Sequence, residues 1–135
     1  MWHEYPIQTR SRTEFVDLTH LVWDAVREWG LREGLCFVFV PHTTAGVTIN
    51  ENADPDVMAD FERSLAEMIP RIPFRHTEGN SPAHIKASLV GSSVVIPVEE
   101  SRPLLGTWQG VYFCEFDGPR RRRVLIGCLE ARPGR

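Results

Sequence analysis

The sequence predicts an α+β domain with a β-sandwich-like core of mixed strands, two longer helices and one short helix. Three observations favour this class. Apolar, β-rich runs recur along the chain, two segments carry apolar residues at helical spacing, and strands and helices do not alternate strictly as in a doubly wound sheet. The 135 residues suit a single domain, placed at 1–135, and 42% hydrophobic residues are enough for one core.

In the first half of the chain, strands are expected at 1–9, 12–17, 35–41 and 46–50. The run 35–41 is continuously apolar, which is typical of a strand buried on both faces, and 46–50 is expected to be its partner. A helix with one apolar stripe follows Asp17, which is expected to be its N-cap. Asp54 should cap a second helix that begins at Pro55 and ends before Pro70.

The second half predicts a polar loop at 71–83, a short helix and three strands. Ser81 and Pro82 should start the helix, and Gly91 should end it. The strands are expected at 93–98, 111–116 and 122–131. Asp117-Gly118 lies between the last two, and its composition predicts a hairpin-type turn.

Composition narrows the class of partner. The formal net charge is −3, so bulk charge gives no reason to expect nucleic acid or an anionic membrane. No run approaches the roughly 20 apolar residues of a membrane span. The amino terminus lacks the apolar stretch of a signal peptide, so a cytoplasmic protein is expected. The three cysteines, Cys36, Cys114 and Cys128, lie in apolar strand-like runs and are expected to be buried reduced thiols.

Three histidines lie at the ends of predicted elements, each within a polar stretch. His42 directly follows an apolar strand and precedes Thr43, while His76 and His84 flank the start of the short helix. Three imidazoles suit zinc or a similar divalent ion, and they suit a phosphate equally well if they are protonated. Taken alone, the spacing of His76 and His84 favours one surface and one structural histidine over a pair of metal ligands.

Two further polar segments, and one carboxylate, are candidates for chemistry. Asn50 and Glu51 lie between a strand and a helix N-terminus, where Asp54 already has a capping role. Thr107, Trp108 and Gln109 lie between two glycines, an arrangement that suits either a binding loop or a tight turn. Glu115 interrupts an apolar strand and needs a partner if it is buried.

The run Arg120–Arg123 raises the alternative of an interaction module. It is short, it follows a turn and it leads into a strand, where successive side chains face opposite sides. A solvated edge or an interface therefore explains it better than a dedicated nucleic-acid surface.

Five motifs, taken in order along nearly the whole chain, resemble the signature of the YjbQ family. They are His42-Thr43-Thr44-Ala45, Asn50-Glu51-Asn52-Ala53-Asp54-Pro55, Pro82-Ala83-His84-Ile85-Lys86-Ala87-Ser88, Gly106-Thr107-Trp108-Gln109-Gly110 and Glu115-Phe116-Asp117-Gly118-Pro119-Arg120. The resemblance implies a β-sandwich-like α+β domain assembled as a homotrimer. The polar positions of the family map onto His42, Asn50, Glu51, Asp54, His76, His84, Gln109 and Glu115. This chain departs from some relatives at Gly79-Asn80-Ser81, where they carry acidic residues, which puts any ligand from that loop in doubt.

The leading functional hypothesis is a small-molecule enzyme with a histidine and carboxylate cleft at a subunit boundary, acting on a small phosphorylated metabolite. The resemblance implies a weak thiamine-phosphate synthase activity, which joins a pyrimidine diphosphate to a thiazole phosphate and releases pyrophosphate. His42, His76 and His84 would hold a divalent ion, zinc or magnesium. The expected catalytic residues are Glu51, Gln109 and Glu115, and the expected substrate-binding residues are Thr43, Asn50, Thr107 and Trp108. The rival hypotheses are a non-catalytic metal- or anion-binding sensor and the interaction module.

Overall fold

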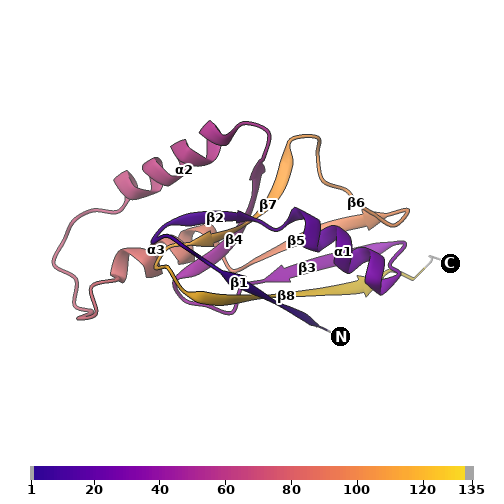
Figure 1. Ribbon diagram of the computed structural model, residues 1–135, viewed down its shortest axis with the longest axis horizontal. Coiled ribbons are helices and arrows are strands. Elements are labelled where there is room, and N and C mark those ends of the chain that lie inside the picture. The colour runs from indigo at the N-terminus through magenta and orange to yellow at the C-terminus, as the bar shows by residue number, and fades with distance from the viewer. Residues whose placement is uncertain (1, 133–135) are drawn as a thin grey trace.

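The computed structural model of the chain describes residues 2–132, which form two antiparallel sheets and three helices (Figure 1). The strands are β1 (His3–Gln8), β2 (Glu14–Asp17), β3 (Gly34–Phe39), β4 (Ala45–Glu51), β5 (Ser93–Glu99), β6 (Arg102–Pro103), β7 (Gln109–Glu115) and β8 (Arg121–Glu130). The helices are α1 (Thr19–Trp29), α2 (Pro55–Met68) and α3 (Ser81–Val90). The predicted fold class is confirmed. No helix within the described residues is long and apolar enough to cross a membrane.

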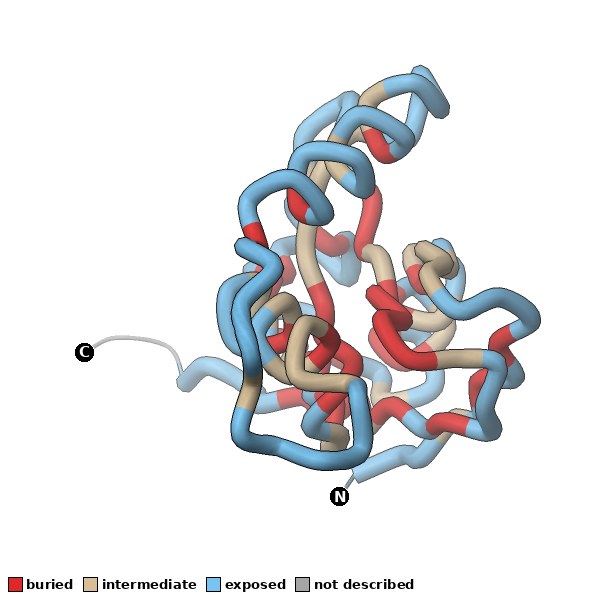
Figure 2. The backbone as a smooth tube through the Cα atoms, turned by 90° about the vertical axis from the view of Figure 1, so that its left-hand side faces the viewer, coloured by how far each residue is buried: buried red, intermediate tan, exposed pale blue. Residues whose placement is uncertain are grey.

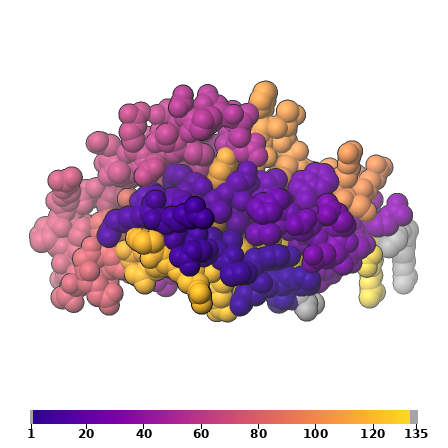
Figure 3. All heavy atoms as spheres, viewed as in Figure 1, coloured from indigo at the N-terminus to yellow at the C-terminus, as the bar shows by residue number. Residues whose placement is uncertain are grey.

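Five strands form one sheet in the order β1-β8-β3-β5-β6, and three form the other in the order β2-β7-β4. The first and last strands therefore lie side by side, with Tyr5 opposite Val124 (Figure 3). Side chains from the facing sides of the two sheets meet α1 in the main core, which includes Val38, Phe113 and Ile126. Buried residues accordingly concentrate in the middle of the molecule (Figure 2).

The outer face of the three-stranded sheet has a second, smaller apolar cluster. Because side chains alternate along β7, the strand contributes to both apolar clusters. Val111 and Phe113 belong to the main core, while Cys114 packs with Leu65 of α2 and Ala87 of α3 in the smaller cluster. The helices α2 and α3 thus cover one side of the three-stranded sheet. The same alternation turns Glu115 toward the space between the two sheets.

Two predicted strand pairings are wrong, for one reason: the chain crosses between the sheets where a direct return was expected. β4 pairs only with β7, whereas β3 lies between β5 and β8. Asp117-Gly118 does not close a hairpin, because β7 and β8 belong to different sheets. Both crossings occur at the same end of the sandwich, and they bring residues 40–44 and 116–120 together there.

The helix starts differ slightly from the prediction. Asp54 caps α2 as expected, accepting the Asp56 N–H at 2.9 Å. Leu18 rather than Asp17 occupies the N-cap position of α1, although Asp17 still accepts the Thr19 N–H at 2.8 Å. Asn80 precedes α3 in the position expected for Ser81, and no side chain caps that helix.

Within the described residues, the outer face of the five-stranded sheet leaves apolar side chains partly exposed, among them Phe39, Val95 and Leu129. The prediction that 35–41 is buried on both faces is therefore wrong for an isolated chain, because Phe39 is 40% exposed and Phe37 only half-buried. Trp2 lies across Gly127, where an added Cβ would collide with its ring. Apolar hollows of about 320 and 230 Å³ flank Trp2.

The three cysteines are buried free thiols, as predicted. Cys36 and Cys128 lie directly opposite each other on neighbouring strands. Burial raises the pKa of Cys36 and of Cys114 to about 12, and it also raises the pKa of Cys128. Because the thiolate is the reactive form, all three should react slowly.

We expect a disulfide reagent to label the native protein slowly and incompletely at neutral pH, and to label three thiols at once in denaturant. Absorbance of the released thiolate measures the rate and the extent of labelling in the native and in the denatured protein. Rapid labelling of all three cysteines in the native protein would contradict the buried arrangement.

Candidate functional site

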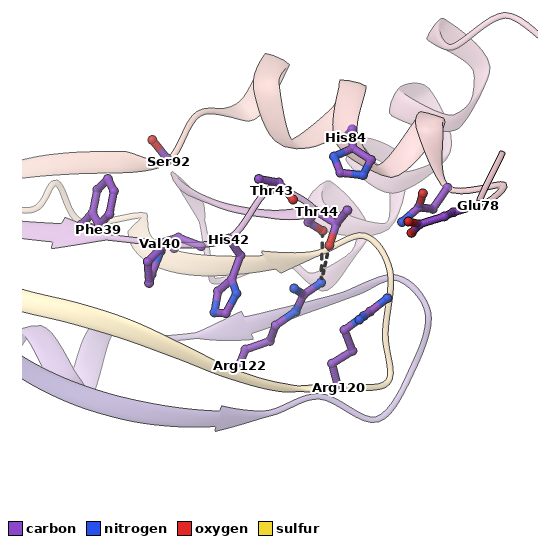
Figure 4. A pocket seen from close by; sticks show the side chains of 12 residues that line it. Phe39, Val40, His42, Thr43, Thr44, Glu78, His84, Ser92, Arg120 and Arg122 are labelled. Atoms are coloured by element: carbon purple, nitrogen blue, oxygen red, sulfur yellow. Dashed lines mark hydrogen bonds between the residues drawn. The ribbon is translucent and has the colours of Figure 1, made fainter. Parts of the chain in front are cut away.

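A pocket of about 570 Å³ opens at the end of the sandwich where the two crossings meet (Figure 4). Its lining combines an apolar wall with basic and hydroxyl side chains, one amide and one carboxylate: Phe39, Val40, Pro41, His42, Thr43, Thr44, Glu78, Asn80, His84, Ser92, Arg120 and Arg122. His84 enters from α3, while the two arginines enter from the start of β8 and the turn before it. A second hollow of about 460 Å³ shares His42, Thr43, His84 and Ser92 with the pocket and continues along α3.

Arg122 lines the pocket and is held there by a buried ion pair with Glu115. Arg122 is in phase with Val124 and Ile126, so β8 turns its side chain inward, where it meets Glu115 from the opposite sheet. The side chains of Arg122 and Glu115 are 5% and 0% exposed. The Arg122 Nε donates to Glu115 Oε1 at 2.8 Å, and Nη2 donates to Glu115 Oε2 and, at 2.8 Å, to Thr44 Oγ1.

Further donors keep the Glu115 carboxylate ionised. Burial of the carboxyl opposes ionisation, but hydrogen bonds from Arg122, from the Thr9 hydroxyl and from the Asp117 N–H outweigh it and hold the pKa of Glu115 below its ordinary value. The same Thr9 hydroxyl accepts the Arg120 N–H at 2.8 Å. One carboxylate thus links the end of β1 to the connection between β7 and β8.

A second carboxylate, Asp117, positions the rim of the pocket. Arg120 donates to its Oδ2 at 2.9 Å, Asn80 Nδ2 donates to the same oxygen at 2.9 Å, and Arg12 lies 3.7 Å away. Burial opposes ionisation of Asp117, but these hydrogen bonds and charges lower its pKa below the ordinary value. Arg120 remains half-exposed, so its guanidinium is held at the pocket without being enclosed.

His42 is neutral in this arrangement. Its Nε2 accepts the Arg123 N–H at 3.0 Å, and a nitrogen that accepts a hydrogen bond carries no proton. Burial, together with the nearby charge of Arg122, lowers the pKa of His42. Only Nδ1 is left for another partner, and in the neutral ring that nitrogen carries the proton.

The structure separates the predicted site residues into two groups. His42, Thr43 and His84 line the pocket, His76 lies beside His84 with ring centroids 5.4 Å apart, and Glu115 lies behind Arg122. The other group is at the far end of the three-stranded sheet, roughly 20 Å along β4 by strand rise: Asn50, Glu51, Thr107, Trp108 and Gln109. There Glu51 lies opposite Gln109, and Trp108 is 62% exposed.

The predicted three-imidazole site does not form within the described part of one chain. Among residues 2–132, no three histidine, cysteine, aspartate or glutamate side chains are grouped to hold a metal ion. His42 in addition uses Nε2 to accept a backbone N–H. Binding of zinc or magnesium stays a prediction.

The arginine run is divided among separate tasks. Arg120 pairs with Asp117, Arg122 with Glu115, and Arg123 with Glu4 at 2.6 Å. Three of the four arginines are thus held in ion pairs, and Arg121 forms none among the described residues. Sequence reasoning missed Arg120, Arg122 and Thr44 as pocket residues. The alternation that places Val124 and Ile126 in the core was the signal that could have placed Arg122 inside as well.

A family model described as UPF0047 protein YjbQ-like matches residues 3–131. The UPF0047 protein of Methanocaldococcus jannaschii is 51% identical over 127 residues, covering 93% of this chain and 92% of that protein. The UPF0047 protein YugU of Bacillus subtilis is 51% identical over 122 residues, covering 89% of this chain and 92% of that protein.

Comparison with solved structures identifies relatives of the same family. An uncharacterised YjbQ/UPF0047 protein from Clostridium acetobutylicum has a TM-score of 0.92 at 52% identity, covering 94% of this chain and 99% of that chain. A protein of unknown function from Sulfolobus solfataricus has a TM-score of 0.91 at 31% identity, covering 97% of each chain. The chain therefore belongs to the YjbQ-like UPF0047 family.

Proposed function

We propose that the pocket binds the phosphoryl group of a small phosphorylated metabolite, and that the protein acts on this metabolite as an enzyme. The observation that carries the proposal is the fixed guanidinium of Arg122. Its Nε and Nη2 are occupied, while no hydrogen bond among the described residues uses Nη1. Arg122 lines the pocket, so Nη1 is the donor available to a ligand there.

Groups around this donor suit a phosphoryl ligand. Arg120 supplies a second guanidinium at the rim, and Thr43 and Ser92 supply hydroxyls. Phe39 and Pro41 form an apolar wall that suits the organic part of a metabolite. Oxyanions favour such an arrangement of guanidinium and hydroxyl donors.

His84 is the group best placed for acid–base chemistry. It lines both the main pocket and the second hollow, and imidazole serves either as acid or as base near neutral pH. The candidate reaction is the thiamine-phosphate synthase transfer, in which a pyrimidine diphosphate joins a thiazole phosphate and pyrophosphate leaves. As the bond from carbon to the diphosphate oxygen breaks and the new bond to the thiazole nitrogen forms, His84 would donate a proton to the departing diphosphate, which Arg120 and Arg122 would bind.

Calorimetric titration with pyrophosphate and with inorganic phosphate tests the binding step. We expect Arg120→Ala to weaken pyrophosphate binding by roughly tenfold to a hundredfold, since a charged hydrogen bond contributes roughly 1.5–3 kcal/mol. Arg121→Ala is the matched control: it removes the same charge one residue away, outside the pocket lining, and should change the affinity less than twofold.

Turnover of the pyrimidine and thiazole pair, followed by pyrophosphate release, tests the reaction. His84→Ala should abolish turnover and still bind pyrophosphate. Two results would contradict the proposal: no binding of either anion at millimolar concentration, or equal losses in the Arg120 and Arg121 variants. Binding by the wild type without any turnover would favour a sensor over an enzyme.

We also propose that the chain assembles as a homotrimer through the apolar face of the five-stranded sheet. Phe39 supports a link between assembly and the site, because it lines both the polar pocket and one of the apolar hollows beside Trp2. A neighbouring subunit seated on that face would lie at the mouth of the pocket, which suits a site at a subunit boundary.

A further inference from the structure

We infer that Glu115 is a positioning residue: its buried carboxylate aims Arg122 at the ligand, and its charge limits how strongly the pocket attracts a phosphate. The sequence suggested a catalytic carboxylate at this position. The inference rests on the proposed phosphate-binding function. It means that the charge of Glu115 sets an upper limit on the affinity of the pocket for phosphate.

The hydrogen bonds of Glu115 leave no oxygen for a substrate. Oε1 accepts from the Thr9 hydroxyl at 2.7 Å and from Arg122 Nε at 2.8 Å. Oε2 accepts from the Asp117 N–H at 3.2 Å and from Arg122 Nη2. The side chain is fully buried and is not part of the pocket lining, so it does not reach a ligand.

Arg122 is held by two residues of the opposite sheet. Glu115 comes from β7 of the three-stranded sheet, and Thr44 precedes β4 of that sheet, while Arg122 itself belongs to β8 of the other. Glu115 and Thr44 fix Nε and Nη2, so the planar guanidinium has one orientation. That orientation also fixes the position of Nη1, the donor left for a ligand. Such a preorganised donor needs no rearrangement when an anion binds.

The charge of Glu115 acts against the ligand. The carboxylate neutralises the guanidinium that would otherwise attract the phosphate, and the interior transmits this effect more strongly than water does. Removing the charge while keeping the shape should therefore have two opposite consequences. The folded protein loses stability, because Arg122 is left as an unpaired buried cation, and its affinity for phosphate rises.

Glu115→Gln tests this with pyrophosphate at pH 7, by calorimetry and by thermal unfolding. We expect the variant to melt below the wild type without ligand, to bind pyrophosphate about tenfold more tightly, and to gain more in melting temperature from it than the wild type does. Glu115→Asp is the matched control. It also disturbs the packing but keeps the charge, so its affinity should not exceed that of the wild type.

Failure of this inference is distinct from failure of the proposed function. If the wild type binds pyrophosphate and Glu115→Gln binds it no more tightly, the claim that the Glu115 charge limits affinity is wrong and the phosphate site stands. If neither protein responds to pyrophosphate, the proposed function fails, and the inference fails with it. A catalytic acid would instead lose turnover without any gain in affinity.

Should Glu115→Gln not fold, the double variant Glu115→Gln, Arg122→Gln answers the question. It carries neither buried charge and so avoids the unpaired cation. We expect it to fold and to bind pyrophosphate at least tenfold more weakly than the wild type. Wild-type affinity in the double variant would overturn the claim that Arg122, held by Glu115, binds the anion.

Discussion

Replacing Arg122 with glutamine should lower the free energy of unfolding by about 3–5 kcal/mol, because the change leaves the Glu115 carboxylate buried without its cation. Domains of this kind have total stabilities of roughly 5–15 kcal/mol, so the loss is a large share. Thr9 and the Asp117 N–H remain as donors, but neither carries a charge. Urea denaturation at pH 7 measures the change.

The neighbouring arginine provides the control. Arg123 forms an ion pair with Glu4 in which both side chains are about half exposed, and such pairs contribute roughly 0–1 kcal/mol. Arg123→Gln should therefore stay within about 1 kcal/mol of the wild type. Equal losses in the two variants would contradict the buried pair as the source of the effect.

The wild type and Arg122→Gln should also differ in how their stability changes as the pH is lowered. The pKa of Glu115 is lower in the folded chain than its ordinary value, so its contribution to stability is complete above the ordinary carboxyl range and is lost as the pH falls below it. Arg122→Gln lacks this contribution at every pH. Its stability should therefore decline less than that of the wild type on acidification, and the two curves should approach each other.

The fold class could be predicted from local patterns, because each pattern depends on a single segment. Asp54 before Pro55 placed the start of α2, and the continuous apolar run from Leu35 placed β3. Pairing between strands depends instead on where the chain crosses from sheet to sheet. Residues 40–44 and 116–120 look like ordinary turns in sequence, yet each passes between the two layers.

The candidate site could be predicted only in part, because some of its residues depend on a single segment and others on how the two sheets stack. His42, Thr43 and His84 were found because polar residues at the ends of elements are visible in sequence. The pairing of Arg122 with Glu115 was missed because the pattern of one strand does not show which residue of another strand lies opposite. Both lie at inward positions of their strands, and only the stacking of the two sheets makes them partners.

Two lysines on the outer face of the five-stranded sheet, in the double variant Val95→Lys, Leu129→Lys, should convert the proposed homotrimer to monomers at micromolar concentration. Val95 and Leu129 are 48% and 57% exposed in the single chain. Burial of side chains of this size in an interface contributes roughly 1.5–3 kcal/mol each, and a buried unpaired ammonium adds a further penalty. Because both positions are already open to solvent in one chain, the isolated fold should survive.

Sedimentation equilibrium distinguishes the states. The wild type should sediment at three times the chain mass of 15.4 kDa, and the double variant at the mass of one chain. Met68→Lys is the matched control, since Met68 is 65% exposed on α2, over the other sheet, and its loss should leave the trimer intact.

The apolar run of β3 gives the physical reason to expect this outcome. Strands with continuous apolar sequences are typical of sheets covered on both faces, and α1 with the three-stranded sheet covers only the inner face of β3. Leu35, Phe37 and Phe39 then lie on the outer face, and the two phenylalanines line the hollows around Trp2. A wild-type chain that remains monomeric at micromolar concentration would show that this face stays open to water, and the proposed placement of the pocket at a subunit boundary would fail with it.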